Sequence, residues 1–444
     1  MIAPLRHRTF RLLFSGQLVS NLGDWLDFLA LVVLIAYTWH RGPGSLAALA
    51  VTIALPWAFA APLLGVLVDR WPKRPVLIGA DLARAAIVTG LIFAPSMWVL
   101  LPLVFAKTLF STAFAPAQQA TIRATVPEGD LLAANSLSQL ATQITKVVGP
   151  ALGGLIVATW SPRVAFGVDA ATFLVSAAIL ARLPRLEIAA VEGHERGSFL
   201  AELREGLVFV WGRRTLGIAI ASMSAAVFLV FTFDTLSPLA LRALGFGPSL
   251  FGLAVGGIGL GAVAGAIAIG SFGHRVQPFK LLGGSKAVAG LLVAVVGLGA
   301  VLELDTSPYL WLPAVLGIGL ASAGVLVSFP TILQLETPPH MMGRVAATAQ
   351  AIPTTLQLIA PVLGAAVATA VGVGWVLVAS GSALAVVGAI VFAWAPSVGG
   401  HERVAPTPEF GLGISAAEPD VVAHMRRVPG SHDHLEGGDT WLTP

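Results

Sequence analysis

The chain has 444 residues, of which 56% are hydrophobic and only 11% are charged. Soluble globular proteins carry about 25% charged residues, so this composition excludes them and predicts an integral membrane protein. The formal net charge of +3 comes from basic residues scattered between apolar runs, which argues against a nucleic-acid interface. The absence of cysteine excludes disulfides, thiolate catalysis and cysteine-based metal sites.

The first predicted element is a basic leader, "MIAPLRHRTFRLLF", which lacks the apolar core and small-residue cleavage site of a signal peptide. Windows of about 20 apolar residues then predict twelve membrane-spanning helices in an all-α fold. We place the spans at residues 12–37, 45–68, 75–95, 98–120, 136–158, 164–183, 215–241, 249–271, 279–302, 308–333, 345–371 and 374–396.

The loop charges predict which side of the membrane each loop faces. Of the 26 Lys and Arg residues, only Arg41, Arg163 and Arg242 lie in loops opposite the N-terminus, and four lie within spans. Positive loops favour the cytoplasm, so we expect a multi-pass protein of the plasma (inner) membrane with both termini cytoplasmic.

Four regions follow from this pattern. They are an N-terminal six-helix bundle (1–183), a cytoplasmic linker with an amphipathic helix at "SFLAELREGLVFVW" (184–214), a C-terminal six-helix bundle (215–396) and a disordered cytoplasmic tail (397–444). The halves also resemble each other, because Pro127 and Pro150 are spaced like Pro338 and Pro361. This register pairs Gln139 with Gln350 and Lys146 with Gln357, as in transporters built from two pseudo-symmetric halves.

The loop after span two, "GVLVDRWPKRPVL", combines a glycine, an acid and several cations. Gly65 is expected to let two helices touch, and Asp69 to lie at the positive N-terminus of a neighbouring helix. The residues resemble the pattern G-x-L-x-D-R-x-G-R-K-x-x-L of the major facilitator superfamily (MFS), with Pro72 in place of a glycine; the matching positions are Gly65, Leu67, Asp69, Arg70, Lys73, Arg74 and Leu77. The resemblance implies the MFS fold and a cytoplasmic gate. The alternative is an ordinary positive loop.

Two further stretches support this resemblance. Asp81 and Arg84 in "GADLARA" are predicted to form a local pair beside the gate. In span five, "KVVGPALGGLIVAT" resembles the antiporter motif of the same superfamily at Gly149, Pro150, Gly153 and Gly154. The leader and first span, "HRTFRLLFSGQLVSNLGDWLDFLAL", together with "GADLARA", resemble the enterobactin-exporter and macrolide-efflux branch. We expect the glycines of span eight, Gly257, Gly261 and Gly265, to face span five, although glycine is common in membrane helices anyway.

Span one carries acids in its apolar stretch "NLGDWLDFLALVVL". Gln17, Ser20, Asn21, Asp24 and Asp27 recur every three or four residues and therefore share one helix face. An isolated acid is costly within a membrane, so we expect this stripe to border a watered cavity. Span five has a matching stripe that includes Gln139 and Lys146, and we expect the two helices to face each other across the cavity.

The hypothesis is that Asp24 or Asp27 alternately binds a proton or interacts with the substrate, while Lys107 and Lys146 tune its affinity. Lys107 stands where the superfamily often has an arginine. Asp234 is predicted at a similar depth in the second half, and Gln357 completes the predicted cavity. The alternative is that the acids only pair with the lysines and orient the helices.

The sequence thus predicts a proton-driven exporter of small amphipathic molecules such as drugs, macrolides or siderophores, working by alternating access. It has no G-x-x-x-x-G-K-[ST] loop, so the energy is expected from an ion gradient. An importer, a lysolipid transporter and a transport-inactive sensor or scaffold remain alternatives. We expect no enzymatic activity, no cofactor, no metal site and a monomer.

Overall fold

The computed structural model describes residues 3–184, 199–272, 276–304, 306–338 and 341–394. Within these ranges all regular secondary structure is helical, and twelve helices are long and apolar enough to cross a membrane. The prediction of an all-α protein with twelve membrane-spanning helices is confirmed. The predicted tail 397–444 and residues 185–198 of the predicted linker lie outside the described residues.

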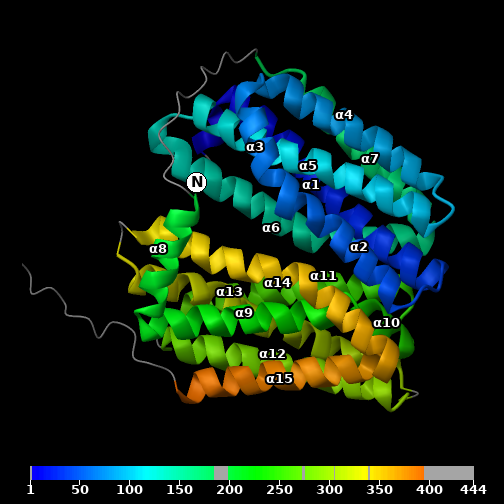
Figure 1. Cartoon of the computed structure of the whole chain (residues 1–444). Coiled ribbons are helices and arrows are strands. Elements are labelled where there is room, and N and C mark those ends of the chain that lie inside the picture. The colour runs from blue at the N-terminus through cyan, green and yellow to red at the C-terminus, as the bar shows by residue number, and fades with distance from the viewer. Residues whose placement is uncertain (1–2, 185–198, 273–275, 305, 339–340, 395–444) are drawn as a thin grey trace, which may run out of the picture. The chain divides into compact units, whose positions relative to one another are not determined.

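The N-terminal bundle, as we call the helices before the linker, crosses the membrane six times (Figure 1). A π-helical turn, Pro56–Ala60, joins α2 to α3, so that these two helices form one long element. The bounds are α1 (Arg8–Val33), α2 (Pro43–Leu55), α3 (Ala61–Arg70), α4 (Lys73–Ile92), α5 (Met97–Thr125), α6 (Glu128–Thr159) and α7 (Pro162–Leu180).

The C-terminal bundle also crosses six times and contains one additional short helix. Its bounds are α9 (Arg214–Asp234), α10 (Ser237–Ala243), α11 (Pro248–Phe272), α12 (Pro278–Val301), α13 (Leu312–Glu336), α14 (Met342–Val371) and α15 (Val373–Ala393). The predicted span 215–241 is wrong at its end, because α9 stops at Asp234. Pro238 instead lies in the first turn of α10, where its missing N–H costs no helical hydrogen bond.

The predicted amphipathic helix is α8 (Phe199–Trp211). Its described part packs against the start of α14, where Glu205 forms an ion pair with Arg344 at 2.8 Å. A Cβ atom on Gly206 would lie 2.5 Å from the Arg344 carbonyl oxygen, so only glycine allows this approach. The helix is therefore attached to the C-terminal bundle.

The hydrophobic cores show where the two bundles meet. We call the membrane side on which α1 begins the N-side and the opposite side the far side. One continuous core fills the far half and includes residues of both bundles, such as Leu29 and Val33 of α1 with Leu236 and Phe251. In the N-side half, each described core draws its residues from one bundle or from that bundle and α8. The bundles are therefore joined on the far side and separate toward the N-side.

Close backbone contacts reinforce the far-side junction. Gly154 of α6 packs against Gly252 of α11, where an added Cβ on Gly252 would lie 2.3 Å from the Gly154 Cα. Beside them, the Arg242 guanidinium donates a hydrogen bond to the Ala36 carbonyl oxygen, and the Tyr37 hydroxyl donates to the Pro238 carbonyl oxygen at 3.2 Å. These contacts link the bundles, so they have to break if the far side opens.

Candidate functional site: a buried charge cluster

The N-terminal bundle encloses six ionisable side chains that contact one another, and we call them the charge cluster. They come from four helices that are far apart in sequence but packed together. The members are Asp24 and Asp27 of α1, Asp81 and Arg84 of α4, Lys107 of α5 and Asp169 of α7.

Lys107 lies at the centre of the charge cluster. Its Nζ is 2.9 Å from the Asp24 Oδ1 and 3.5 Å from the Asp169 Oδ2, and it also donates a hydrogen bond to Asp27. The ammonium lies 5.5 Å from the centre of the Phe173 ring, close enough for a cation–π contact. One cation is thus shared by three carboxylates from two helices.

Arg84 is the second cation. It forms an ion pair with Asp81 one turn earlier in α4, and its Nη1 lies 3.4 Å from the Asp24 Oδ2. The guanidinium makes cation–π contacts with two rings, 4.7 Å from the centre of Phe114 and 4.3 Å from that of Phe173. Asp24 therefore contacts both cations and connects the two halves of the cluster.

Exposure divides the charge cluster into one accessible group and five buried ones. The Asp24 side chain is 31% exposed, whereas the other five side chains are at most 8% exposed. The Asp27 Oδ1 is buried and has no hydrogen-bond partner among the described atoms. A buried carboxylate oxygen without a donor is costly, and a proton on it would remove that cost.

Gly23 explains how Asp169 reaches the charge cluster. A Cβ atom on Gly23 would lie 2.1 Å from both the Asp169 Oδ1 and the Thr172 Oγ1. The Thr172 hydroxyl donates a hydrogen bond to the Asp169 main-chain carbonyl oxygen at 2.7 Å, which positions this hydroxyl against α1. The missing side chain on α1 therefore provides the space that the Asp169 carboxylate occupies.

The charges in the cluster do not balance. Four carboxylates face two cations, so the fully ionised cluster carries two negative charges in excess. In a membrane interior an uncompensated charge is expensive, and a carboxyl group can lose its charge by taking up a proton. The arrangement can therefore hold protons, and Asp24 is its most exposed member.

The structure brings Asp24, Asp27 and Lys107 together, but it places Lys146 and Asp234 elsewhere. The Lys146 side chain is exposed, and its Nζ lies 5.5 Å from the centre of the Trp25 ring. Asp234 is the exposed last residue of α9. Both residues therefore lie outside the charge cluster, Lys146 on α6 of one bundle and Asp234 on α9 of the other.

The predicted polar stripe of span one does not line a cavity along its length. Gln17, Ser20 and Asp27 are buried where α1 packs on its neighbours in the bundle, and Asp27 contacts Lys107 of α5. The Asn21 amide lies 3.4 Å from the Thr142 hydroxyl of α6, so the stripes of spans one and five do face each other, but in contact. Gln139 of α6 is exposed and Gln357 of α14 is half-buried.

The residues of the predicted gate hold helix ends. The buried Lys73 Nζ donates to the Val68 carbonyl oxygen at 2.6 Å, and Arg74 donates to the Ala181 carbonyl oxygen at the end of α7. Arg70 is exposed, and the Asp69 side chain lies outside the described part of the structure.

Two expectations about the gate are corrected. Gly65 makes no close helix contact, since a Cβ there would meet open space, as the N-side halves of the bundles are apart. Asp81 and Arg84 do pair, but their next partner is Asp24 and the pair belongs to the charge cluster.

The glycines of the predicted antiporter motif pack on two helices at once. A Cβ on Gly149 would lie 2.5 Å from the Trp25 Cβ of α1, and one on Gly153 would lie 3.1 Å from the Leu26 carbonyl oxygen. Gly154 faces α11 instead, as described above. Pro150 lies within α6, which continues on both sides of it.

The prediction that Gly257, Gly261 and Gly265 of span eight face span five is wrong. Gly257, Gly261 and Gly265 face Leu316 and Leu320 of α13, whereas the α11 residues against α6 are Gly252, Gly256 and Gly259. The two sets lie on different faces of one glycine-rich helix. Glycine spacing alone does not say which face meets which neighbour.

Sequence reasoning missed Asp169, which it left without a role, as it did Lys286. Lys286 of α12 is buried, and its Nζ donates to the Ser222 hydroxyl at 2.9 Å. The available signal for both was an ionisable residue inside a membrane span, which is by itself a functional-site hypothesis. That signal gives no partner, and the partner of Asp169 is supplied by packing.

Twelve apolar helices in two bundles, joined on one side and separate on the other, define a multi-pass membrane transporter. The family model of the Major Facilitator Superfamily matches residues 13–355. Among solved structures, a nucleoside transporter, NupG (D323A mutant), superposes with a TM-score of 0.68 at 14% identity, covering 88% of this chain and all of the other. The chain therefore belongs to the Major Facilitator Superfamily, and its predicted fold is confirmed.

Relatives of known sequence agree with this family and with the branch. The chain is 28% identical to an uncharacterized MFS-type transporter of Bacillus subtilis (strain 168), covering 85% of this chain and 91% of the relative. It is 23% identical to macrolide efflux protein A of Streptococcus pyogenes (84% and 92%). It is 27% identical to the enterobactin exporter EntS of Salmonella choleraesuis (strain SC-B67), covering 76% and 80%.

Proposed function

We propose that this protein is a proton-driven exporter of small amphipathic molecules, working by alternating access with its N-side in the cytoplasm. The observation that carries the proposal is the charge cluster, which combines two excess carboxylates with a single exposed member, Asp24. Such a cluster can exchange protons with solvent through Asp24 while its other members stay buried.

Proton binding at the charge cluster has a route to conformational change. A proton on Asp24 removes a negative charge that holds both Lys107 and Arg84, so the contacts among α1, α4 and α5 weaken. Asp27 and Asp169 remain as partners for Lys107. Because α1 also packs on α6, and α6 forms the far-side junction with α11, a change at the cluster can bias that junction.

The direction of transport is supported by the relatives, and the structure is in a state that an exporter could load. The N-side halves of the bundles are apart while the far side is joined, so an amphipathic molecule can enter from the N-side. Two relatives carry export in their names, one for macrolides and one for enterobactin. Transport of those compounds belongs to the relatives, and for this chain we propose only amphipathic molecules as a class.

Reconstitution tests the proposal. Proteoliposomes with an imposed pH gradient and an internal pH dye would be screened with a panel of amphipathic compounds for substrate-dependent proton movement. We expect Asp24→Asn and Asp27→Asn, singly and together, to lower it at least about tenfold, since coupling needs an ionisable group. Asp130→Asn, which removes an acid outside the charge cluster that pairs with His7, is the matched control and keeps transport. Undiminished proton movement in the double variant overturns the coupling role.

Proton-driven uptake into membrane vesicles of known orientation tests the direction of transport separately. Uptake of a compound into inverted vesicles, driven by an acidic interior, is the result expected of an exporter. Uptake only into right-side-out vesicles identifies an importer and contradicts the proposal.

A further inference from the structure

A cavity of about 460 Å³ lies at the far end of the molecule, between the bundles. One wall is the turn between α1 and α2, from His40 to Pro43. The other walls are α10, from Leu239 to Ala243, the end of α12 at Ala300 and Val301, and the turn between α14 and α15, from Val371 to Trp375. Because both bundles contribute walls, the cavity exists only while the far side is closed.

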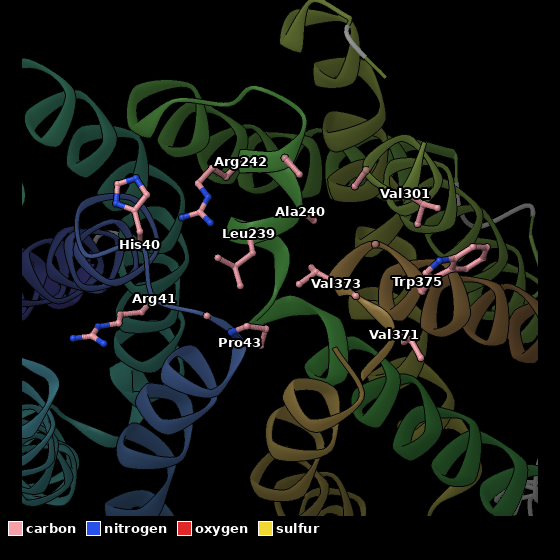
Figure 2. A pocket seen from close by; sticks show the side chains of 15 residues that line it. His40, Arg41, Pro43, Leu239, Ala240, Arg242, Val301, Val371, Val373 and Trp375 are labelled. Carbon is pink, nitrogen blue, oxygen red and sulfur yellow. The ribbon is translucent and has the colours of Figure 1, made fainter. Parts of the chain in front are cut away.

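The cavity is basic at one end. Among its described lining residues, His40, Arg41 and Arg242 are basic and none is acidic. Figure 2 shows these three at one end of the cavity and Val371, Val373 and Trp375 at the other. Far-side loops of this chain are poor in cations, yet two of the three Arg residues predicted there line this cavity.

Arg242 is held in place by its bond to the Ala36 carbonyl oxygen. A guanidinium has five N–H donors, so this bond leaves others for an anion. Phosphate groups suit such a site, because arginine donates to their oxygens in pairs. The basic end of the cavity therefore fits a phosphate-bearing headgroup.

A second cavity, of about 680 Å³, adjoins the first and is lined mainly by apolar side chains. It runs along α14 past Leu363 and Val367, and Val371 and Trp375 line both cavities. Each of these four side chains is about half exposed, so the groove is open at the surface of the membrane-spanning helices. A basic end followed by an apolar groove matches an amphipathic ligand with an anionic head and an acyl chain.

We propose that one anionic phospholipid of the far leaflet binds here, with its phosphate among His40, Arg41 and Arg242 and an acyl chain in the groove along α14. The lipid bridges the two bundles, so it stabilises the state that is closed on the far side. This role is separate from transport of a substrate. Free phosphate shares the head chemistry but would occupy only the basic end.

The experiment measures the far-side opening directly. The chain contains no cysteine, so spin labels attach only to cysteines that are introduced. We choose Phe93→Cys with Leu302→Cys, because both positions are exposed and lie at the far ends of different bundles. Distance distributions between the two spin labels are recorded by double electron–electron resonance in nanodiscs of phosphatidylcholine with and without phosphatidylglycerol. We expect phosphatidylglycerol to raise the ratio of closed to open populations about fivefold or more, the effect typical of one cation near an anionic surface.

Variants separate the parts of the site. His40→Gln with Arg41→Gln removes an exposed imidazole and an exposed guanidinium, and Val367→Trp fills the groove; each is expected to abolish the phosphatidylglycerol effect. Arg163→Gln, a predicted far-side cation outside the cavity, keeps it. Inorganic phosphate added to phosphatidylcholine nanodiscs is expected to leave the populations unchanged. An equal response to phosphate alone, a retained effect in the groove variant, or no response to phosphatidylglycerol overturns the proposal.

Discussion

Lys107 shows how much one residue depends on its neighbours in this protein. Its ammonium is nearly buried and is shared by Asp24, Asp27 and Asp169. The acids of α1 and Lys107 could be singled out from the sequence, because charges inside membrane spans are rare. Asp169 and Arg84 could not be assigned to them, since their contacts depend on how α4 and α7 are rotated against α1.

Lys107→Gln is predicted to destabilise the protein strongly. The change leaves three carboxylates without their shared cation, and breaking a buried ion pair in this way typically costs about 3–5 kcal/mol. Thermal unfolding in detergent should show a clearly lower Tm, whereas Lys280→Gln at an exposed position should leave the Tm unchanged. Adding Asp27→Asn should recover part of the loss. Equal Tm values for the two lysine variants contradict the central position of Lys107.

Gly23→Ala is predicted to disturb the charge cluster by displacing Asp169. The new Cβ would meet the Asp169 and Thr172 oxygens at 2.1 Å, so Asp169 has to move away from Lys107. Overpacking of this kind costs about 1–3 kcal/mol. Gly79→Ala on α4 faces open space and should be neutral or slightly stabilising. Urea or thermal unfolding compares the two, and a Gly23 variant as stable as the Gly79 variant would speak against the packing.

At the scale of elements, α11 presents different glycines to different neighbours. Gly252, Gly256 and Gly259 meet α6, whereas Gly261 and Gly265 meet α13. Glycine has no side chain, so the backbones of neighbouring helices can come into contact, as is typical of closely packed membrane helices. The contact with α6 joins the two bundles, so it is the contact on which far-side closure depends.

Gly252→Ala is therefore predicted to shift the protein away from the far-side-closed state. Its Cβ would lie 2.3 Å from the Gly154 Cα, so α6 and α11 have to separate on the far side. Gly270→Ala lies on the same helix, where an added Cβ meets nothing. Spin-label distances between Phe93→Cys and Leu302→Cys should lengthen in the first variant only. Unchanged distances would show that the junction tolerates a methyl group.

At the scale of the whole molecule, the two sides of the membrane differ in packing. The far half has one core that both bundles share, while the described N-side cores are separate. Loop charges predict that the N-side is cytoplasmic. Together these two points support a state ready to receive a molecule from inside the cell.

Single cysteines in this cysteine-free chain test the orientation. Tyr309→Cys lies in the far-side loop between α12 and α13, and Leu335→Cys lies at the N-side end of α13; both positions are well exposed. A membrane-impermeant maleimide added to intact cells is expected to label Tyr309→Cys and not Leu335→Cys. Permeabilised cells, in which both react, provide the control. The reverse pattern would invert the predicted direction of transport.

The sequence by itself determined the number of spans and the helical class, because a chain in lipid has to satisfy its backbone hydrogen bonds within each apolar segment. It also carried the motif residues on which the family resemblance rests. Tertiary structure decided which residues meet. Asp169 reaches Lys107 through the space left by Gly23, and α11 turns Gly252 rather than Gly257 toward α6. Such contacts depend on the rotation and distance of neighbouring helices, which periodicity along one helix does not encode.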